Sequence, residues 1–501
     1  MTPTSPSASP PAHSSLPFEG YVIAGATVVD GSGRPSHCAD VRVRAGRIAA
    51  VGRVDRSESD HVLDASGLVL SPGFIDTHAH DDTAALHQHG LRPKRQQGVT
   101  TVVTGNCGIG IAPGSPELDA RLSADLKAVL GFPAPPRLPS FSSFVDALDA
   151  APLQCNVRPL VAHAALRYLA ALPDQREPAD AGGRQRLAAL LDDALDQGAA
   201  GMSTGLVYEP CSAADPEELV TLAARLAARG AVFAVHVRDE GARLLPSLRE
   251  VIDVARRSAC RLHISHLKAT GRGSVDRMER ALDLIDTERA AGVDITFDVY
   301  PYAAGSTALL PALRADENRG EPRSTVQLTS VPGEPELSGR WLSDVAEERG
   351  LTLEQTAAMI LDRSPSTSAI IHMMHPESVK LALAHEACFI GSDGLPSPDG
   401  LTHPRQYGTF PRVLERYCGT DGLTLERVIS RMTALPSERF SVPGRGRIEP
   451  GLAADLVLFD PLLLGETGTY ELPAQRPRGM SAVLVAGRAD DDGTFGQGQV
   501  L

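Results

Sequence analysis

The sequence lacks the features that would direct the protein to a nucleic acid or a membrane. Its formal net charge is −14, its pI is near 5.5 and it has no run of basic residues, which argues against nucleic acids and anionic membranes as partners. No stretch approaches the roughly 18 uninterrupted apolar residues of a membrane span. Residues 1–17 are rich in Ser and Pro and contain no Lys or Arg, so they do not resemble a secretory signal, and we expect a disordered tail there.

Cysteine is also sparse. The seven cysteines are scattered along the chain and odd in number, which argues against a disulfide framework and favours a reducing compartment.

With 501 residues, of which 42% are hydrophobic, the chain can bury a large core. We therefore expect a soluble, cytoplasmic protein.

The two ends of the chain share a β-rich pattern. Between residues 18 and 72, short apolar or alternating runs are separated by turn residues, which is typical of strands. Two further runs, at 454–460 and 482–487, close the chain. The sequence therefore predicts one β-sandwich domain assembled from residues 18–72 and 445–501.

The middle of the chain, residues 73–444, alternates apolar strand-like runs with helical patterns rich in Ala, Leu and Arg. Eight strand–helix units favour a parallel sheet, and the length suits an α/β fold of the (β/α)8 TIM-like barrel type. A doubly wound open sheet is the alternative, but no glycine-rich phosphate-binding loop opens the first unit. The predicted barrel strands are 73–77, 100–104, 156–162, 201–203, 232–236, 261–266, 294–299 and 387–392.

One segment interrupts this alternation. Residues from about 303 to 365 are at first polar and rich in Pro and Gly, and we interpret them as a lid-like insertion over the mouth of the barrel. A decoration of the surface is the alternative. Residues 369–374 form either an extra strand or the seventh strand of the barrel.

His78 and His80 are the most informative pair in the sequence. They follow the apolar run 68–75, which predicts a buried strand, and residues two apart in a strand project to the same side. Two imidazoles at the end of such a strand can bind one metal ion, and imidazole suits zinc and its borderline neighbours. The alternative is that both are ordinary core or loop histidines.

Other candidate ligands also stand at the ends of predicted strands. Cys107, His236, His266 and Asp393 each follow a different strand. Because barrel active sites form at the C-terminal ends of the strands, we expect these side chains to converge with the histidine pair. Four histidines, one cysteine and one aspartate are the donors of a hydrolytic site with one or two metal ions.

Longer motifs surround these candidate ligands and recur near the end of the chain. They are TGNCG at 104–108, GMSTGL at 201–206, HVRDE at 236–240, ISHLK at 264–268, DVYPY at 298–302, SDGLP at 392–396, HPR at 403–405 and GLAADLV at 451–457. Together with the His-x-His pair they resemble the amidohydrolase superfamily and, within it, the D-aminoacylase (N-acyl-D-amino-acid deacylase) family. The resemblance spans about residues 20–490, and Cys107 distinguishes this family from relatives that bridge their metals with a carboxylated lysine.

The resemblance implies both a reaction and a set of roles. The reaction is zinc-dependent hydrolysis of the amide bond of N-acyl-D-amino acids, which gives a carboxylate and a free D-amino acid. A metal-activated water would attack the acyl carbonyl, with Asp393 as general base and then general acid. A tight zinc ion would be held by Cys107, His236 and His266, and a second, weaker site would be formed by His78, His80 and Asp393.

An N-acyl amino acid carries a free carboxylate, so its recognition requires a cation. Arg405 is the first candidate, because a guanidinium group matches a carboxylate at two points. Lys268, two residues after His266, is the second candidate, and Tyr208 and Tyr300 are candidate hydroxyl donors. A surface ion pair or a core tyrosine is the alternative for each.

Several other histidines are assigned no metal. His87 and His89 follow the first site in a predicted helix or loop, and we interpret them as non-ligands. His263 alternates with Ser265 and is expected to face away from His266, outside the barrel. His163 ends the third strand and is a candidate to line the pocket.

Two other functions are compatible with the barrel. One is a cyclic-amide hydrolase of the dihydropyrimidinase type, against which stand Cys107 and the missing bridging lysine near Gly201. The other is a catalytically inactive scaffold of amidohydrolase shape, although every expected ligand is present. The preferred side chain and acyl group are left open by the sequence.

Overall fold

The computed structural model describes residues 20–57, 60–121, 127–133, 138–310, 325–397, 401–489 and 498–501. The predicted disordered tail, residues 1–17, lies outside the described residues. Within these ranges every helix is too short or too polar to traverse a lipid bilayer.

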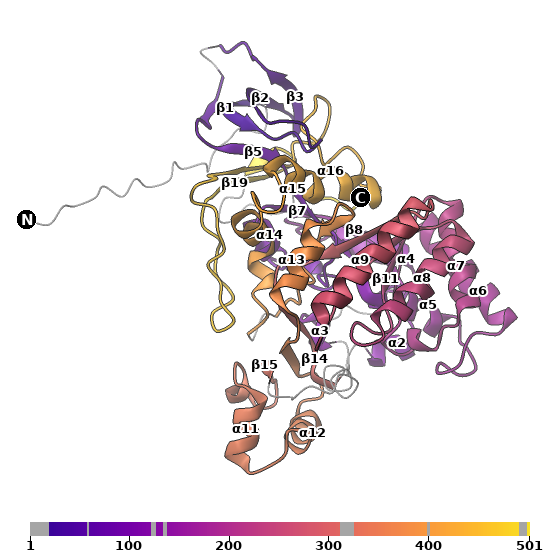
Figure 1. The fold of residues 1–501 in the computed structure, drawn as a ribbon. Helices are drawn as coiled ribbons and strands as arrows, with labels where there is room; N and C mark the ends of the chain where they lie inside the picture. The colour runs from indigo at the N-terminus through magenta and orange to yellow at the C-terminus, as the bar shows by residue number, and fades with distance from the viewer. Residues whose placement is uncertain are drawn as a thin grey trace, which may run out of the picture.

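Strands from both ends of the chain form one sheet at the top of Figure 1. The strands are β1 (Tyr21–Val28), β2 (His37–Arg44), β3 (Arg47–Gly52), β4 (Val62–Asp64), β5 (Val69–Pro72), β18 (Leu456–Phe459), β19 (Met480–Val485) and β20 (Arg488–Ala489). The order is β20-β19-β18-β5-β1-β2-β3, with β4 paired to β1. On β2, Val41 and Val43 are buried and alternate with the more exposed Arg42 and Arg44, so the period-two pattern directs one face to the core. β18 joins the two ends, because it pairs with β5 on one side and β19 on the other.

A parallel barrel occupies the middle of the chain, as predicted. Its strands are β6 (Phe74–Asp76), β7 (Val99–Thr104), β8 (Asn156–Pro159) continued by β9 (Val161–Ala162), β10 (Gly201–Gly205), β11 (Val232–His236), β12 (Arg261–Ile264), β13 (Ile295–Val299) and β17 (Cys388–Ile390). They form two parallel ladders, β6-β7-β8 and β9-β10-β11-β12-β13-β17. The ladders meet where β8 runs into β9 and where β6 approaches β17.

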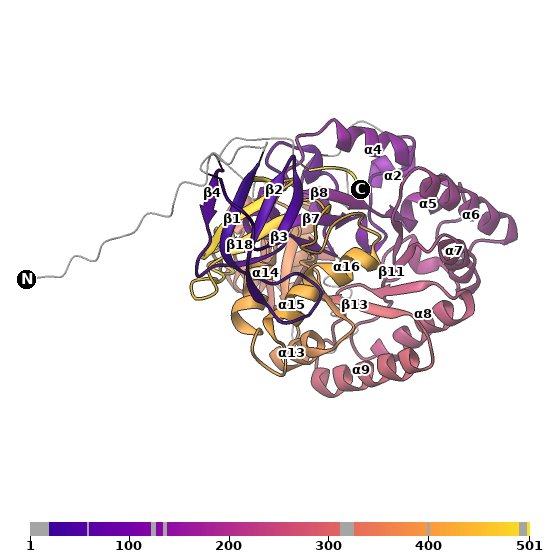
Figure 2. The ribbon, with the colours of Figure 1, turned by 90° about the horizontal axis from the view of Figure 1, so that it is seen from above.

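Helices cover the outside of the barrel and form an outer ring when the molecule is seen from above (Figure 2). On α8 the buried residues Leu244, Leu248, Val251 and Ala255 recur at helical spacing, so one face packs against the barrel. The helices of this part of the chain are α1 (Arg92–Gln96), α2 (Pro116–Arg121), α3 (Lys127–Leu130), α4 (Phe141–Asp149), α5 (His163–Leu169), α6 (Ala181–Asp196), α7 (Pro216–Ala228), α8 (Leu244–Ser258), α9 (Ser274–Ala290), α13 (Pro376–Ala384), α14 (Arg405–Arg416), α15 (Leu425–Met432) and α16 (Ala434–Arg439).

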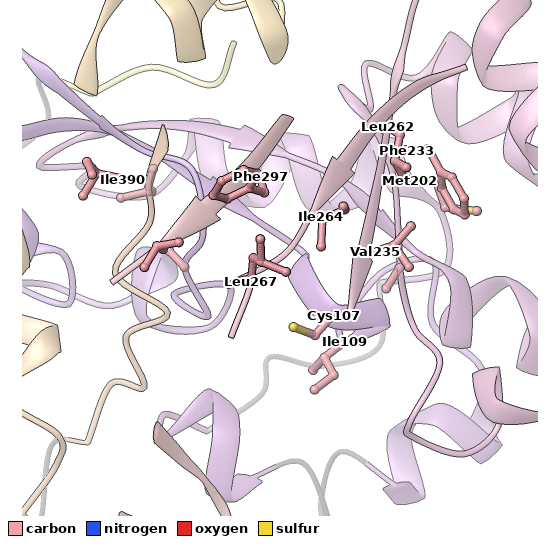
Figure 3. Packing of buried hydrophobic residues seen from close by; sticks show 14 of the residues in the cluster. Cys107, Ile109, Met202, Phe233, Val235, Leu262, Ile264, Leu267, Phe297 and Ile390 are labelled. Carbon is pink, nitrogen blue, oxygen red and sulfur yellow. The ribbon is translucent and has the colours of Figure 1, made fainter. Parts of the chain in front are cut away.

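Side chains on the barrel strands alternate between the interior and the helices. On β11, Val232 and Ala234 belong to an apolar cluster with Phe389 and Phe440, whereas Phe233 and Val235 pack in the cluster shared with the helices. Figure 3 shows part of the cluster shared with the helices, in which Met202, Phe233 and Leu262 lie on the three neighbouring strands β10, β11 and β12. The interior positions of β11 are therefore 232, 234 and 236, and the last of them, His236, lies at the mouth of the barrel.

The prediction that His263 lies outside the barrel is wrong. Its ring packs against Phe389 and Phe440 of the interior cluster, with ring centroids 5.7 and 5.0 Å away. The period-two argument fails because β12 ends at Ile264 and the backbone of His266 has a φ of 33°. The turn after the strand brings His266 back to the side that His263 faces.

The insertion is a small folded unit, drawn at the bottom of Figure 1. Its strands β14 (Ala304–Ala308), β16 (Ser368–His372) and β15 (Val326–Ser330) form an antiparallel sheet, against which α11 (Leu342–Arg349) and α12 (Leu353–Arg363) pack. Leu328, Leu342, Val345, Ile360 and Ile371 belong to its own apolar core. The segment 369–374 thus contributes to an extra strand, because β13 pairs directly with β17 and leaves no place for a further barrel strand.

A buried lysine closes the barrel between β6 and β17. Lys94 of α1 donates hydrogen bonds to Asp76 Oδ2 at 2.8 Å and to the Ser392 hydroxyl, and it lies 3.3 Å from Asp81 Oδ2. The Lys94 side chain is fully buried, which would lower its pKa, but Asp76 and Asp81 outweigh burial and raise it. Asp76 Oδ1 accepts from the backbone N–H groups of both His78 and Ser392, so one carboxylate ties the two strand ends together.

Replacement of Lys94 by Met should destabilise the fold strongly. The variant leaves Asp76 and Asp81 buried without their cation, and breaking a buried ion pair costs about 3–5 kcal/mol. Urea unfolding followed by circular dichroism measures the change. Lys380→Met, which removes an ion pair to Asp421 that is 41% exposed on the lysine side, is the control. An unchanged midpoint for both variants would contradict this role of Lys94.

Candidate metal centre

The predicted donors meet at the C-terminal ends of the barrel strands. None of these six residues is more than 6% exposed. His236 is the last residue of β11, Cys107 lies in the short helix η2 (Asn106–Gly108) after β7, and His266 follows β12. The donors that the structure brings together are His78, His80, Cys107, His236, His266 and Asp393, with Glu240 beside them.

Cys107 is the shared centre of this cluster. Its Sγ atom lies 3.3 Å from Nε2 of His78 and 3.3 Å from Nε2 of His266. The rings of His236 and His266 are perpendicular, with centroids 4.4 Å apart. Asp393 Oδ1 lies on the other side, 3.3 Å from His80 Nε2. A single thiol thus stands between the ligands predicted for the tight site and those predicted for the second site.

The donor atoms form overlapping groups, each small enough to surround one metal ion. Within each group all donor atoms lie within 4.8 Å of one another. The groups are His78 with Cys107 and His266, His78 with His80 and Asp393, and His236 with Glu240 and His266.

The backbone at three of the donors is left-handed. The φ angles are 55° at Cys107, 33° at His266 and 49° at Asp393, a region that non-glycine residues avoid at a cost of about 1–3 kcal/mol each. Gly105, which precedes Cys107, has a φ of 76°, and a Cβ there would lie 2.2 Å from the Leu160 carbonyl oxygen. Sharp turns after the strands therefore direct these side chains into the barrel mouth.

The charges of the cluster suit a divalent metal. Burial would raise the pKa of the Cys107 thiol, but His78 and His266 outweigh it and hold the pKa well below its ordinary value. Burial would also raise the pKa of Asp393, yet Arg405 and the surrounding histidines hold it well below its usual range. A thiolate, a carboxylate and several imidazoles are the ligands that zinc prefers. Moreover, Nδ1 of His80 and Nδ1 of His236 are buried without a hydrogen-bond partner among the described residues, so the donor set fits a metal.

Two carboxylates, Asp298 and Glu240, contact the ring nitrogens of the candidate histidine ligands and orient the rings. The sequence analysis gave neither of them a role. Asp298 Oδ2 lies 3.3 Å from His78 Nδ1 and 2.9 Å from His263 Nε2, and Asp298 Oδ1 accepts from the backbone N–H of His266. Glu240 Oε1 lies 3.1 Å from His266 Nδ1. Such partners fix the tautomer and orientation of metal-binding histidines. The period-two pattern of β13 was a signal for Asp298, because it is the last residue of that strand on the interior side.

A cavity of about 550 Å3 opens from the donor cluster. The cluster forms one wall, and strands β14 and β16 of the insertion form another. Among the residues predicted to bind substrate, Lys268, Tyr208 and Tyr300 line the cavity. Lys268 donates a hydrogen bond to Glu240 Oε1, and its Nζ atom lies 2.8 Å from His266 Nδ1, so it is held at the edge of the cluster.

Arg405 is fully buried and is not among the residues that line the cavity. Its Nη1 lies 2.9 Å from Asp393 Oδ2, and its guanidinium group stacks on the Tyr300 ring at 4.6 Å from the ring centroid. The Nε group of Arg405 and the hydroxyl group of Tyr300 have no hydrogen-bond partner among the described residues. Two buried donors without partners thus lie beside Asp393.

The remaining histidines lie apart from the donor cluster. Among the described residues His87 and His89 belong to none of the groups that could hold a metal. His163 bonds to Thr204 Oγ1 and Glu218 and does not line the cavity.

Comparisons with known proteins agree on one family. The model of the amidohydrolase family matches residues 61–489. A D-aminoacylase of Alcaligenes xylosoxydans xylosoxydans is 39% identical over 94% of this chain and 94% of its own, and an N-acyl-D-aspartate deacylase of the same organism is 40% identical over 94% and 92%. The crystal structure of an N-acyl-D-glutamate deacylase from Bordetella bronchiseptica, complexed with zinc and a phosphonate inhibitor that mimics the tetrahedral reaction intermediate, is 37% identical, covers 96% of this chain and 99% of its own, and superposes with a TM-score of 0.88.

Replacement of Cys107 by Ala should strip the tightly bound metal. The variant removes the thiolate that two imidazoles face at 3.3 Å, and the remaining donors are weaker ligands for zinc. Elemental analysis after dialysis against a weak chelator should find about one zinc per chain in the parent protein and far less in the variant. Cys38→Ala, which changes an exposed thiol on β2, should retain the zinc. Full retention by the Cys107 variant would refute this ligand.

Proposed function

The chain belongs to the D-aminoacylase family of amidohydrolases, and from this we infer that it is a zinc-dependent hydrolase of the amide bond of N-acyl-D-amino acids. The products are a carboxylate and a free D-amino acid. The observation that carries this function is the buried cluster of a thiolate, imidazoles and Asp393 at the end of a cavity of about 550 Å3. Because all seven cysteines are free, we also propose a cytoplasmic location.

We propose that the tight zinc is held by Cys107, His236 and His266, and that His78, His80 and Asp393 form a weaker second site. The position of Cys107 between the two sets supports this division, because its thiolate is within reach of both. When bound, zinc supplies Lewis acidity that lowers the pKa of water toward neutrality and polarises the acyl carbonyl.

Asp393 is placed to move the proton in this reaction. Its carboxylate is ionised at neutral pH, because Arg405 and the histidines lower its pKa. Oδ2 is engaged by Arg405, which leaves Oδ1 facing His80 and the cavity side of the cluster. Oδ1 can therefore accept a proton from the attacking water and later deliver it to the leaving nitrogen.

For the substrate carboxylate we propose Arg405 together with Tyr300, whose buried donors lack partners among the described residues. Charge-assisted hydrogen bonds to a carboxylate would satisfy both groups. Lys268 is the second cation, and Tyr208, which shares the cavity wall, is a further hydroxyl donor. Both cations lie next to the metal cluster, so an amino acid bound by its carboxylate would present its acyl amide to the donors.

Chirality is the first test of this function. Zinc-loaded protein should hydrolyse at least one of the N-acetyl derivatives of D-Leu, D-Met, D-Asp and D-Glu and leave the matching L-enantiomers intact. Release of the free amine, followed by a ninhydrin or chromatographic assay, measures both. Absence of hydrolysis for the whole D-panel would refute the proposal, and turnover of a hydantoin instead would favour a cyclic-amide hydrolase.

The role of Arg405 is tested by pairing a variant with a modified substrate. Arg405→Met should lower kcat/KM for an N-acetyl-D-amino acid about 10- to 100-fold, the equivalent of roughly 1.5–3 kcal/mol for a lost charge-assisted hydrogen bond. The loss should be smaller for the corresponding D-amino acid amide, which has no carboxylate. Arg416→Met, on the same helix with a 54% exposed side chain, is the control. Equal losses of kcat/KM for the acid and the amide would contradict carboxylate binding and would show that Arg405 acts only through its ion pair with Asp393.

A further inference from the structure

The motif GMSTGL at 201–206 has no task in the proposed reaction. Residues 201–205 form β10, which pairs with β9 on one side and with β11 on the other. Met202 packs in the cluster shared with the helices (Figure 3), so the alternation of the strand turns Ser203 toward the interior of the barrel. Ser203 is fully buried, and a buried hydroxyl group requires hydrogen-bond partners. Its partners belong to the turn that carries Cys107.

The Ser203 hydroxyl group joins two backbone groups on either side of Cys107. It donates to the carbonyl oxygen of Gly105, and it accepts from the backbone N–H of Gly108 at 2.9 Å. The single proton of the hydroxyl group and one of its lone pairs are therefore both used by this turn. Because Gly105 and Gly108 are themselves buried, the hydroxyl group closes the turn at both ends in a place that water does not reach.

Strand β10 approaches this turn at backbone distance. A Cβ added to Gly205 would lie 2.2 Å from the carbonyl oxygen of Cys107, so a side chain at position 205 would push the two segments apart. The strand and the turn therefore pack as one unit. This unit holds Cys107 at its φ of 55°, a conformation that the residue would otherwise leave.

The same strand sets the position of His236, another proposed ligand of the tight zinc. Gly205 pairs with His236 in the parallel ladder of β10 and β11, and the backbone N–H of Leu206 donates to the His236 carbonyl oxygen at 2.9 Å. One strand is thus bonded to the turn of Cys107 through Ser203 and to the backbone of His236 through its end. The protein itself therefore fixes where the thiolate stands relative to this imidazole.

We propose that Ser203 is a positioning residue of the tight zinc site, whose hydroxyl group holds the turn of Cys107 in the conformation that presents the thiolate to the metal. Without this hydroxyl group the Gly105 carbonyl and the Gly108 N–H lose their partner, and the turn can relax. Zinc binding must then also order the turn, which lowers the affinity. The proposal rests on the proposed function, because it takes Cys107 and His236 as ligands of the tight zinc.

The first experiment measures the zinc affinity of the metal-free full chain in competition with a chromophoric chelator. Ser203→Ala should raise the zinc dissociation constant about 10- to 100-fold, the loss typical when a group that orients a metal ligand is removed. Ser265→Ala is the matched control, because Ser265 is 1% exposed and precedes His266, but its hydroxyl group has no hydrogen-bond partner among the described residues. This control should keep the parent constant. Equal constants for the two variants would overturn the proposal.

A spectroscopic measurement separates this role from a general loss of stability. Cobalt(II) at saturating concentration takes the place of zinc and reports a thiolate ligand through charge-transfer absorption in the near ultraviolet. The parent and Ser265→Ala should show the same band. Ser203→Ala should show a weaker or shifted band, while its far-ultraviolet circular dichroism stays that of the parent. A cobalt band identical to that of the parent would contradict the positioning of Cys107 by Ser203.

A third measurement needs no variant and therefore does not depend on how Ser203→Ala folds. In the metal-free parent chain, hydrogen exchange followed by mass spectrometry should find the segment 104–109 already protected, because Ser203 holds the turn in the absence of metal. Rapid exchange of this segment until zinc is added would overturn the proposal. None of the three measurements needs turnover, so a failure to hydrolyse the D-substrates would refute the proposed function and leave metal binding to decide the role of Ser203.

Discussion

The chemistry of this protein depends on the closure of its barrel at β6 and β17. His78 and His80 follow the first of these strands and Asp393 follows the last, so they meet only if the two strand ends are joined. Asp76 joins them by accepting from backbone groups on both sides, and Lys94 neutralises it in a site that water does not reach. A charge buried without its partner is costly, so the Asp76–Lys94 pair holds the two strand ends together. This connection fixes the position of His80 relative to Asp393, although the two residues are 313 positions apart in the sequence.

Much of the fold and of the metal cluster could be predicted from the sequence, because one local pattern, an apolar run that ends in a polar residue, indicates both a barrel strand and a residue at the barrel mouth. Barrel strands such as 232–236 are short apolar runs, and a polar residue at the end of such a run is informative because the mouth of the barrel is the place where it is tolerated. His78, Cys107, His236 and Asp393 all carried that signal.

The rest depends on contacts that leave no local pattern. Lys94 has the sequence context of a surface helix, and its burial follows only from Asp76 and Ser392, the latter far along the chain. His263 was misplaced because alternation was extended past the end of β12, into a turn with a left-handed residue. The insertion's own sheet could be foreseen only in part, because the run 369–374 indicated β16, whereas β14 and β15 carry no continuous apolar run. Tertiary pairing, rather than local propensity, decides all three.

The sheet built from both ends of the chain has a consequence for how the protein is made. β5 emerges from the ribosome early, but its neighbour β18 is synthesised nearly 400 residues later, as the pairing of Val69 with Phe459 shows. Until then β5 presents an open, apolar edge of the kind that recruits other chains. Completion of translation, rather than folding of the barrel alone, therefore ends the interval in which the nascent polypeptide is most exposed to aggregation.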